Sequence, residues 1–195
     1  AEPRQLLGRR RGQRDGGMPL DNRGVGAGAR PGLWSIGHRN VQGAALHPQT
    51  GELWVSEHGP QGGDEINIAR AGANYGWPRI GFGRHYDTGL PVGDATTSPD
   101  VESPRHYWAP TSVSPSGIAF YTGTAVPAWK SSAFVGALST TSLRRVTFAG
   151  ADVTGFEVML ATEGERIRDV RMGPDGHLYL LTDSGKGRIL RVTAQ

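Results

Sequence analysis

Cysteine is absent from the 195 residues of this sequence, which excludes a disulfide framework, a thiolate zinc site and a cysteine nucleophile. Long apolar runs are absent as well, since no stretch approaches the ~20 residues that a membrane-spanning helix needs. We therefore expect no membrane span. The motifs H-E-x-x-H, G-x-S-x-G and the P-loop do not occur either, so hydrolase and nucleotide-hydrolase chemistry lack local support.

Apolar residues are sparse, at 36% of the chain, but this supply suffices for a folded core. The 30 glycines and 13 prolines are too many for a helical bundle and lack the triplet period of collagen. This composition favours a fold built from short strands and many turns.

Positive charge is concentrated at the N-terminus, where seven arginines fall within the first thirty residues, although the net charge is only +3. Such an arm suggests nucleic acid, but no aromatic residue is interleaved for base stacking, so we expect no nucleic-acid partner. We treat residues 1–32 as a Gly/Arg-rich segment, either flexible or the remnant of an earlier repeat. Residues 33–195 form the folded part.

Strand patterns recur from residue 33 onward. Two hairpins share one form: a strand, a proline-containing turn closed by glycine, and a second strand that ends in an acidic residue. Repeated hairpins of this kind predict an all-β fold, with about three blades of a β-propeller. An open β-sandwich is the alternative. The strand-like segments are residues 43–48, 51–57, 117–121, 133–138, 143–148, 169–174, 175–183 and 187–192.

Residues 58–110 separate the first two repeats, and an insert of this length is more often a functional loop than a spacer. The insert begins with Gly59 and Pro60, followed by the acidic pair Asp64 and Glu65. Backbone carbonyls and carboxylates are the oxygen ligands that calcium prefers. The alternative is a solvated acidic pair, because no D-x-D-x-D-G loop is present.

Two polar clusters are candidates for ligand binding. Arg39, Asn40 and Gln42 place one cation and two amides just before a strand, which suits an anionic ligand rich in carbonyls. Arg166 and Arg168 alternate along a strand and therefore share a face, where they repel each other unless an anion lies between them. The alternatives are a turn whose side chains bond to local backbone, and a surface ion-pair cluster with Glu163, Glu165 and Asp169.

Several motifs occur together in a characteristic order. On these motifs the sequence resembles the soluble glucose/sorbosone dehydrogenase family, and most closely the bacterial aldose sugar dehydrogenases that use pyrroloquinoline quinone (PQQ). The resemblance runs from about residue 33 to residue 192. The motifs are residues 34–43, 51–54, 57–67, 72–78, 114–121, 134–138 and 166–176.

The resemblance implies a six-bladed propeller that binds PQQ and an aldose in a groove at one end of its axis. It implies oxidation of the sugar to a lactone, an external electron acceptor, and a periplasmic or secreted location, and it allows a homodimer of the complete enzyme. The implied calcium ligands are the carbonyls of Gly59 and Pro60 beside PQQ, with Glu65 and the carbonyl of Tyr75 at a second calcium. The implied PQQ-binding residues are Arg39, Asn40, Gln42, Tyr86, Ala137, Leu138, Ser139, Arg166 and Arg168.

Two departures from the family pattern affect the expected activity. Ser139 stands where the family places a lysine beside the quinone. The family's catalytic base is a histidine on an earlier blade, and none of the six histidines here falls in that motif. We therefore expect no catalytic base in this chain, and no activity from the chain alone. The alternative function is a non-catalytic propeller of the same family that binds a sugar or a protein.

Overall fold

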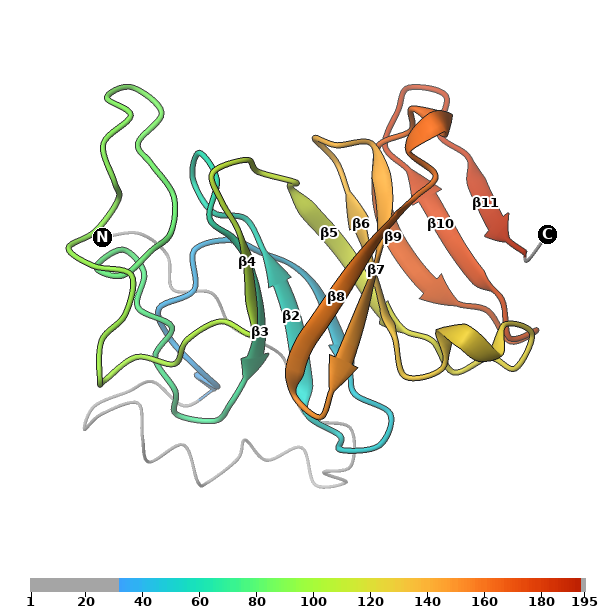
Figure 1. The fold of residues 1–195 in the computed structure, drawn as a ribbon, viewed down its shortest axis with the longest axis horizontal. Helices are drawn as coiled ribbons and strands as arrows, with labels where there is room; N and C mark the ends of the chain where they lie inside the picture. Colours follow the sequence, from blue (N-terminus) through green and yellow to red (C-terminus); the bar gives the residue numbers. More distant parts are fainter. Residues whose placement is uncertain (1–31, 194–195) are drawn as a thin grey trace.

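The computed structural model describes residues 32–193, which form three antiparallel sheets and contain no α-helix (Figure 1). None of these residues belongs to a helix long and apolar enough to cross a membrane. The predictions for residues 1–31 lie outside the described residues. In each sheet the strands lie in chain order, so each strand after the first of its sheet pairs with the one before it.

The first sheet contains β1 (Val41–Leu46), β2 (Leu53–Glu57), β3 (Asp64–Ala69) and β4 (His106–Trp108). The second contains β5 (Pro115–Phe120), β6 (Ala133–Ala137), β7 (Ser142–Ala149) and β8 (Asp152–Met159). The third contains β9 (Ile167–Met172), β10 (Leu178–Thr182) and β11 (Ile189–Val192). Two 3₁₀ turns, η1 (Pro127–Trp129) and η2 (Ala161–Glu163), complete the structure.

The first strands of the three sheets lie next to one another, with β5 in contact with both β1 and β9. Meandering sheets stacked face to face, with their first strands adjacent, are the blades of a β-propeller. The prediction of about three blades is confirmed, and the chain is a partial propeller.

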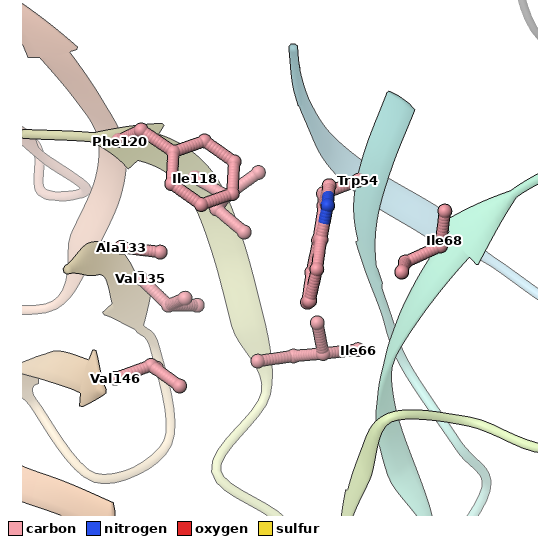
Figure 2. Packing of buried hydrophobic residues seen from close by; sticks show 8 residues of the cluster. All are labelled: Trp54, Ile66, Ile68, Ile118, Phe120, Ala133, Val135 and Val146. Carbon is pink, nitrogen blue, oxygen red and sulfur yellow. The ribbon is translucent and has the colours of Figure 1, made fainter. Parts of the chain in front are cut away.

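The core lies in two layers between the blades. β5 contributes to both layers because successive side chains of a strand point to opposite faces. Ile118 and Phe120 face the first blade, where they meet Trp54 (Figure 2). Ala119 faces the third blade, in a cluster that includes Leu178. A blade buried on both faces needs apolar residues at consecutive positions, which explains the uninterrupted apolar run at residues 118–121.

The region expected as one insert is different in the structure. Residues 58–110 contain β3 and β4, so the irregular segment is limited to residues 70–105. β3 escaped detection because Asp64, Glu65 and Asn67 give it the composition of a loop, although Asp64 and Asn67 are fully buried within a sheet. These polar side chains belong to the candidate site described below.

His106 on β4 is expected to make stability dependent on pH. Its ring packs against Trp108 and against Phe156 of the second blade, and burial lowers its pKa to about 4, with a smaller contribution from the charge of Arg144. Between pH 6.5 and 4 the unfolded chain takes up a proton that the folded chain does not, so stability falls as pH falls. Because His106 is partly exposed to solvent, we expect the free energy of unfolding to fall by only about 1 kcal/mol between pH 7 and pH 5.

Denaturant unfolding at the two pH values measures this effect. His106→Phe keeps the ring packing and should reduce the pH dependence by about that amount. The exposed His85→Asn is the control and should leave it unchanged. An unchanged slope in His106→Phe would show that another group carries the acid sensitivity.

Candidate functional site

Hydrogen bonds between the blades bring the predicted site residues to one end of the inner strands. Ser56 Oγ, near the end of β2, donates to the carbonyl of Ser116 on β5 over 2.6 Å. Ser116 Oγ in turn donates to the carbonyl of Ile167 on β9 over 2.6 Å. Both serines are buried, so these bonds fix the starts of β5 and β9 relative to the end of β2.

Arg39 lies at this end, immediately before β1. Its backbone N–H donates to Glu57 Oε2 over 3.0 Å, and its Nη1 donates to the carbonyl of His58 over 3.1 Å. The guanidinium lies over the ring of Trp77, 5.2 Å from its centre. Its Nε is buried and has no hydrogen-bond partner in the described part of the chain. Arg39 is therefore held in place with donor capacity left for a ligand.

Asn40 and Gln42 lie beside Arg39 and bond to each other. Gln42 Nε2 donates to Asn40 Oδ1 over 2.8 Å, and the carbonyl of Asn40 accepts from the N–H of His58. The alternative of a turn held by local hydrogen bonds is thus present in part, because the two side chains bond to each other and the backbone of Asn40 bonds to that of His58. The remaining amide groups lie at the surface of the same end.

Arg166 and Arg168 do share a face, and their common partner is Asp183. Asp183 Oδ2 accepts from Arg166 Nη2 at 2.8 Å and from Arg168 Nη2 at 2.9 Å. These bonds hold the pKa of the Asp183 carboxyl below its usual range. Glu163, Glu165 and Asp169, the carboxylates near in sequence, are not the partners of this pair. Two guanidinium groups share one carboxylate, so the cluster carries an excess positive charge.

The segment 137–139 lies beside Arg166 and beside the loop that precedes β5. Arg166 Nη1 approaches the carbonyl of Leu138 at 3.4 Å, and the exposed Ser139 donates through Oγ to the carbonyl of Ser112 over 3.0 Å. Ala137 is fully buried as the last residue of β6. Tyr86 is different: its side chain is 72% exposed in the segment 70–105, and it does not line the cavity described next.

All four predicted calcium-binding residues line one small cavity, with a volume of about 20 Å³. A space of this size holds about one water-sized sphere, so a single ion fits. The described residues contain no cluster of three His, Cys, Asp or Glu side chains that could hold a metal, so carbonyl ligands would be needed as well. The four residues are Gly59, Pro60, Glu65 and Tyr75.

The charge in the cavity wall suits a cation. Burial, and then the charge of Glu57, raise the pKa of Glu65 to about 8. Asn67 Nδ2 is shared between Glu57 Oε1 at 2.8 Å and Glu65 Oε2 at 2.9 Å, while its own Oδ1 is buried and has no hydrogen-bond partner among residues 32–193. A bound divalent cation would relieve the repulsion between the two carboxylates. The residues present therefore fit the calcium that the family resemblance implies.

A network of buried hydrogen bonds and ring contacts holds Glu57 and Tyr75, which line this cavity. His38 Nδ1 lies 3.0 Å from Glu57 Oε1, and His38 Nε2 lies 2.9 Å from Ser35 Oγ. The His38 ring stacks on Tyr75, with ring centres 4.4 Å apart. The hydroxyl of Tyr75 donates to the carbonyl of Ile68. The orientation of Glu57 and Tyr75 is therefore fixed by side chains that are themselves buried and bonded.

Gly59 can occupy its position only as glycine, because a Cβ there would collide with the carbonyls of Gly62 and Gly63. Its N–H donates to Asp64 Oδ1 over 2.9 Å. Asp64 Oδ2 accepts from Ser112 Oγ and from the N–H groups of Val113 and Ser114. Asp64 therefore joins the turn at Gly59 to the loop that precedes β5.

The expected acidic pair is thus split between two roles. Asp64 and Glu65 are neighbours in a strand and point to opposite faces, so only Glu65 borders the cavity. Sequence reasoning did not assign roles to Glu57 and Asp183, which bond to Arg39 and to the Arg166–Arg168 pair. A signal for both existed: each is the acidic residue at or just after the end of the second strand of a repeated hairpin.

Comparison with known proteins finds relatives that share the sequence and the fold of this chain. The Escherichia coli protein described as aldose sugar dehydrogenase YliI is 43% identical over 180 residues, covering 91% of this chain and 48% of that protein. A crystal structure of a glucose dehydrogenase has a TM-score of 0.86 at 50% identity, covering 91% of this chain and 52% of the other. The PQQ-bound form of aldose sugar dehydrogenase from Streptomyces coelicolor has a TM-score of 0.64 at 29% identity, with coverages of 86% and 48%.

The fold and the relatives together define the class of protein: this chain is a partial β-propeller of the sugar dehydrogenase type. A family model described as Glucose / Sorbosone dehydrogenase matches residues 5–191, and the chain belongs to that family. The chain spans about half the length of the curated relatives it matches.

Proposed function

We propose that this chain forms the PQQ- and calcium-binding part of an enzyme that oxidises aldose sugars to lactones. The observation that carries the proposal is the Arg166–Arg168 pair, which lies on one face and shares a single carboxylate. PQQ bears three carboxylates, and guanidinium groups bind carboxylates with charge-assisted, often bidentate, hydrogen bonds. Membership of the family, and the PQQ-bound relative, support the choice of this cofactor.

Separate groups of residues would bind PQQ and calcium. Arg166 and Arg168 would hold carboxylates of PQQ, while Arg39, Asn40 and Gln42 would donate to its remaining oxygens. The carbonyls of Gly59 and Pro60 would hold the calcium beside the cofactor. Glu65 and the carbonyl of Tyr75, the residues that the family resemblance implies for a second calcium, line the same cavity and would provide oxygen ligands there.

The chemistry supplied by bound PQQ is that of a quinone which accepts a hydride. Oxidation of an aldose to a lactone also removes a proton from the anomeric hydroxyl, which needs a general base. We assign that base to a part of the enzyme outside this chain, on the family resemblance. An external electron acceptor and a periplasmic or secreted location belong to the same proposal.

Replacement of Arg168 tests the proposal. Arg168→Leu should weaken PQQ binding by about 10- to 100-fold, or ~1.4–2.7 kcal/mol, because a charge-assisted bond to a carboxylate is lost. Arg191→Leu is the matched control. Arg191 lies on β11 of the same blade and is ion-paired with Asp175 at 3.7 Å. Titration of PQQ, followed by tryptophan fluorescence, measures both, and equal losses in the two variants would indicate general electrostatics rather than a groove.

A second function is favoured by Ser139. Its hydroxyl is bonded to the carbonyl of Ser112, and it contributes no cation where the family has a lysine. A non-catalytic propeller that binds a sugar or a protein would tolerate this change. The same titration separates the two functions, because such a propeller has no need to bind PQQ.

A further inference from the structure

Another cavity lies at the end of the blades opposite the candidate site. It has a volume of about 420 Å³ and lies between the turn that joins β1 to β2 and the segment that joins β5 to β6. The candidate site lies where β1 and β5 begin, whereas this cavity lies where the same two strands end (Figure 1). Small-molecule sites have volumes of about 300–1,000 Å³, so this space is large enough for a small ligand.

One wall of this cavity is the turn between β1 and β2, which contributes Pro48 and Gln49. The turn is closed by the N–H of Gly51, which donates to the carbonyl of His47 over 2.9 Å. The ring of His47 packs edge-on against Phe120, the last residue of β5, with ring centres 4.7 Å apart. This turn of the first blade is therefore held against the second blade.

The other wall is the segment 121–131. Its two ends are joined by the N–H of Tyr121, which donates to the carbonyl of Ser132 over 2.9 Å. Tyr121 is buried, and its hydroxyl accepts from the N–H of Val126 over 3.1 Å. Arg145 of β7 donates through Nε to Ser132 Oγ over 3.0 Å. This wall is therefore held by bonds of its own, so the cavity forms without a ligand.

The polar groups that line the cavity are hydroxyls, one amide and one cation. The cation is Lys130, and no carboxylate belongs to the lining. Its ammonium group makes no hydrogen bond or ion pair within the part of the chain that the structure describes. The cavity thus carries one positive charge that no carboxylate compensates. The hydroxyl and amide groups belong to Gln49, Tyr121, Thr122, Thr124 and Ser131.

The backbone is strained at this cavity. Ser131 has a φ of +62°, in the left-handed region that residues other than glycine rarely adopt because it costs energy. Backbone strain of this kind is concentrated at binding sites, where it places a group that a ligand needs. Here it places Ser131 in the lining directly after Lys130. The strain is explained if these two side chains share one ligand.

These groups fit a small organic anion that also bears hydroxyls. One lysine balances one negative charge, so a carboxylate fits better than a phosphate monoester, which carries about two charges at pH 7. Hydroxyl and amide groups both donate and accept, as the hydroxyls of a sugar chain require. Pro48 and Pro127 add apolar surface for the carbon atoms of such a chain.

We propose that the cavity between the β1–β2 turn and the segment 121–131 binds a small polyhydroxy carboxylate, such as a sugar acid, with Lys130 paired to the carboxylate. This site is separate from the candidate site for PQQ and calcium, and it does not rest on the proposed function. The ligand would contact the first and second blades together. Its binding would therefore hold these blades against each other and stabilise the folded chain.

D-Gluconate, a polyhydroxy carboxylate, is the probe. Its binding to the 195-residue chain is measured by isothermal titration calorimetry, without PQQ or Ca²⁺. Lys130→Met removes the charge of an exposed side chain, so the fold should remain intact, and gluconate should bind about tenfold or more weakly. Gln49→Ala, on the opposite wall, should weaken gluconate binding about threefold or more. Glucose lacks the carboxylate and acetate lacks the hydroxyls, so each should bind at least ~10-fold more weakly than gluconate.

Lys186→Met is the matched control. It removes the same charge from an exposed position between β10 and β11, and should leave gluconate binding within about twofold of the parent chain because distant surface charges are screened. Saturating gluconate should also raise the denaturant midpoint of the parent chain, and should have little effect on that of Lys130→Met.

Several results would overturn the inference. A parent chain that does not bind gluconate would remove the site, and acetate that binds as tightly as gluconate would remove the hydroxyl recognition. Equal weakening by Lys130→Met and Lys186→Met would indicate general electrostatics. Loss of gluconate binding in Arg168→Leu, with Lys130→Met unchanged, would place the anion at the arginine pair instead. Because PQQ and Ca²⁺ are absent from this test, its failure is distinct from failure of the proposed function.

Discussion

Joining residues 33–195 to the N-terminal half of the Escherichia coli aldose sugar dehydrogenase should raise sugar oxidation at least ~100-fold above that of the 195-residue chain alone. The lower bound follows from the ~10²–10⁴-fold contribution of a general base, which we place outside this chain. The E. coli protein is a suitable donor because this chain matches 48% of its length at 43% identity. A dye-linked assay with glucose, PQQ and Ca²⁺ measures the turnover of both proteins.

The fusion has an internal control in the arginine pair. Replacing both Arg166 and Arg168 by leucine in the fusion should abolish the gain if the cofactor is bound by residues of this chain. Turnover by the 195-residue chain equal to that of the fusion would contradict the prediction. It would require a base among the histidines of the chain itself, and His58 would be examined first because it borders the cavity.

The blades could be predicted from the sequence because their signals are local. The hairpins at β1–β2 and β9–β10 each contain a proline turn closed by glycine between two apolar strands, and both form as predicted. β3 could not be recognised in this way, since Asp64, Glu65 and Asn67 lie in a strand for reasons of long-range bonding. β8 is an outer strand with a mostly exposed, polar pattern, and it offers no apolar run to detect.

The site could be predicted only in part. The alternation of Arg166 and Arg168 showed that they share a face, but not that Asp183 would be their partner, because that contact depends on the pairing of β9 with β10. The bonds from Ser56 to Ser116 and on to Ile167 span 60 and 51 residues, and no local pattern reveals them. Family motifs indicated which residues to examine, and the fold brought most of them together.

Asp64 is the residue whose replacement should destabilise the chain most. It is 0% exposed and accepts four hydrogen bonds, with donor distances of 2.9 Å to Gly59 N, 2.6 Å to Ser112 Oγ, 2.7 Å to Val113 N and 2.8 Å to Ser114 N. Asp64→Asn exchanges one acceptor oxygen for an NH₂ group, which would then face a donor. At least one buried N–H loses its partner, and a charged acceptor becomes neutral.

The expected loss for Asp64→Asn is about 3–5 kcal/mol in the free energy of unfolding, the range seen when one member of a buried charged network is removed. Denaturant unfolding of the metal-free chain measures it, with the exposed Asp152→Asn on β8 as a control that should stay within about 0.5 kcal/mol. Because Asp64 also holds the N–H of Gly59, the variant should lose Ca²⁺ binding together with stability. A variant with parental stability but no Ca²⁺ binding would instead make Asp64 a direct participant in the metal site, and the role assigned to it here would be wrong.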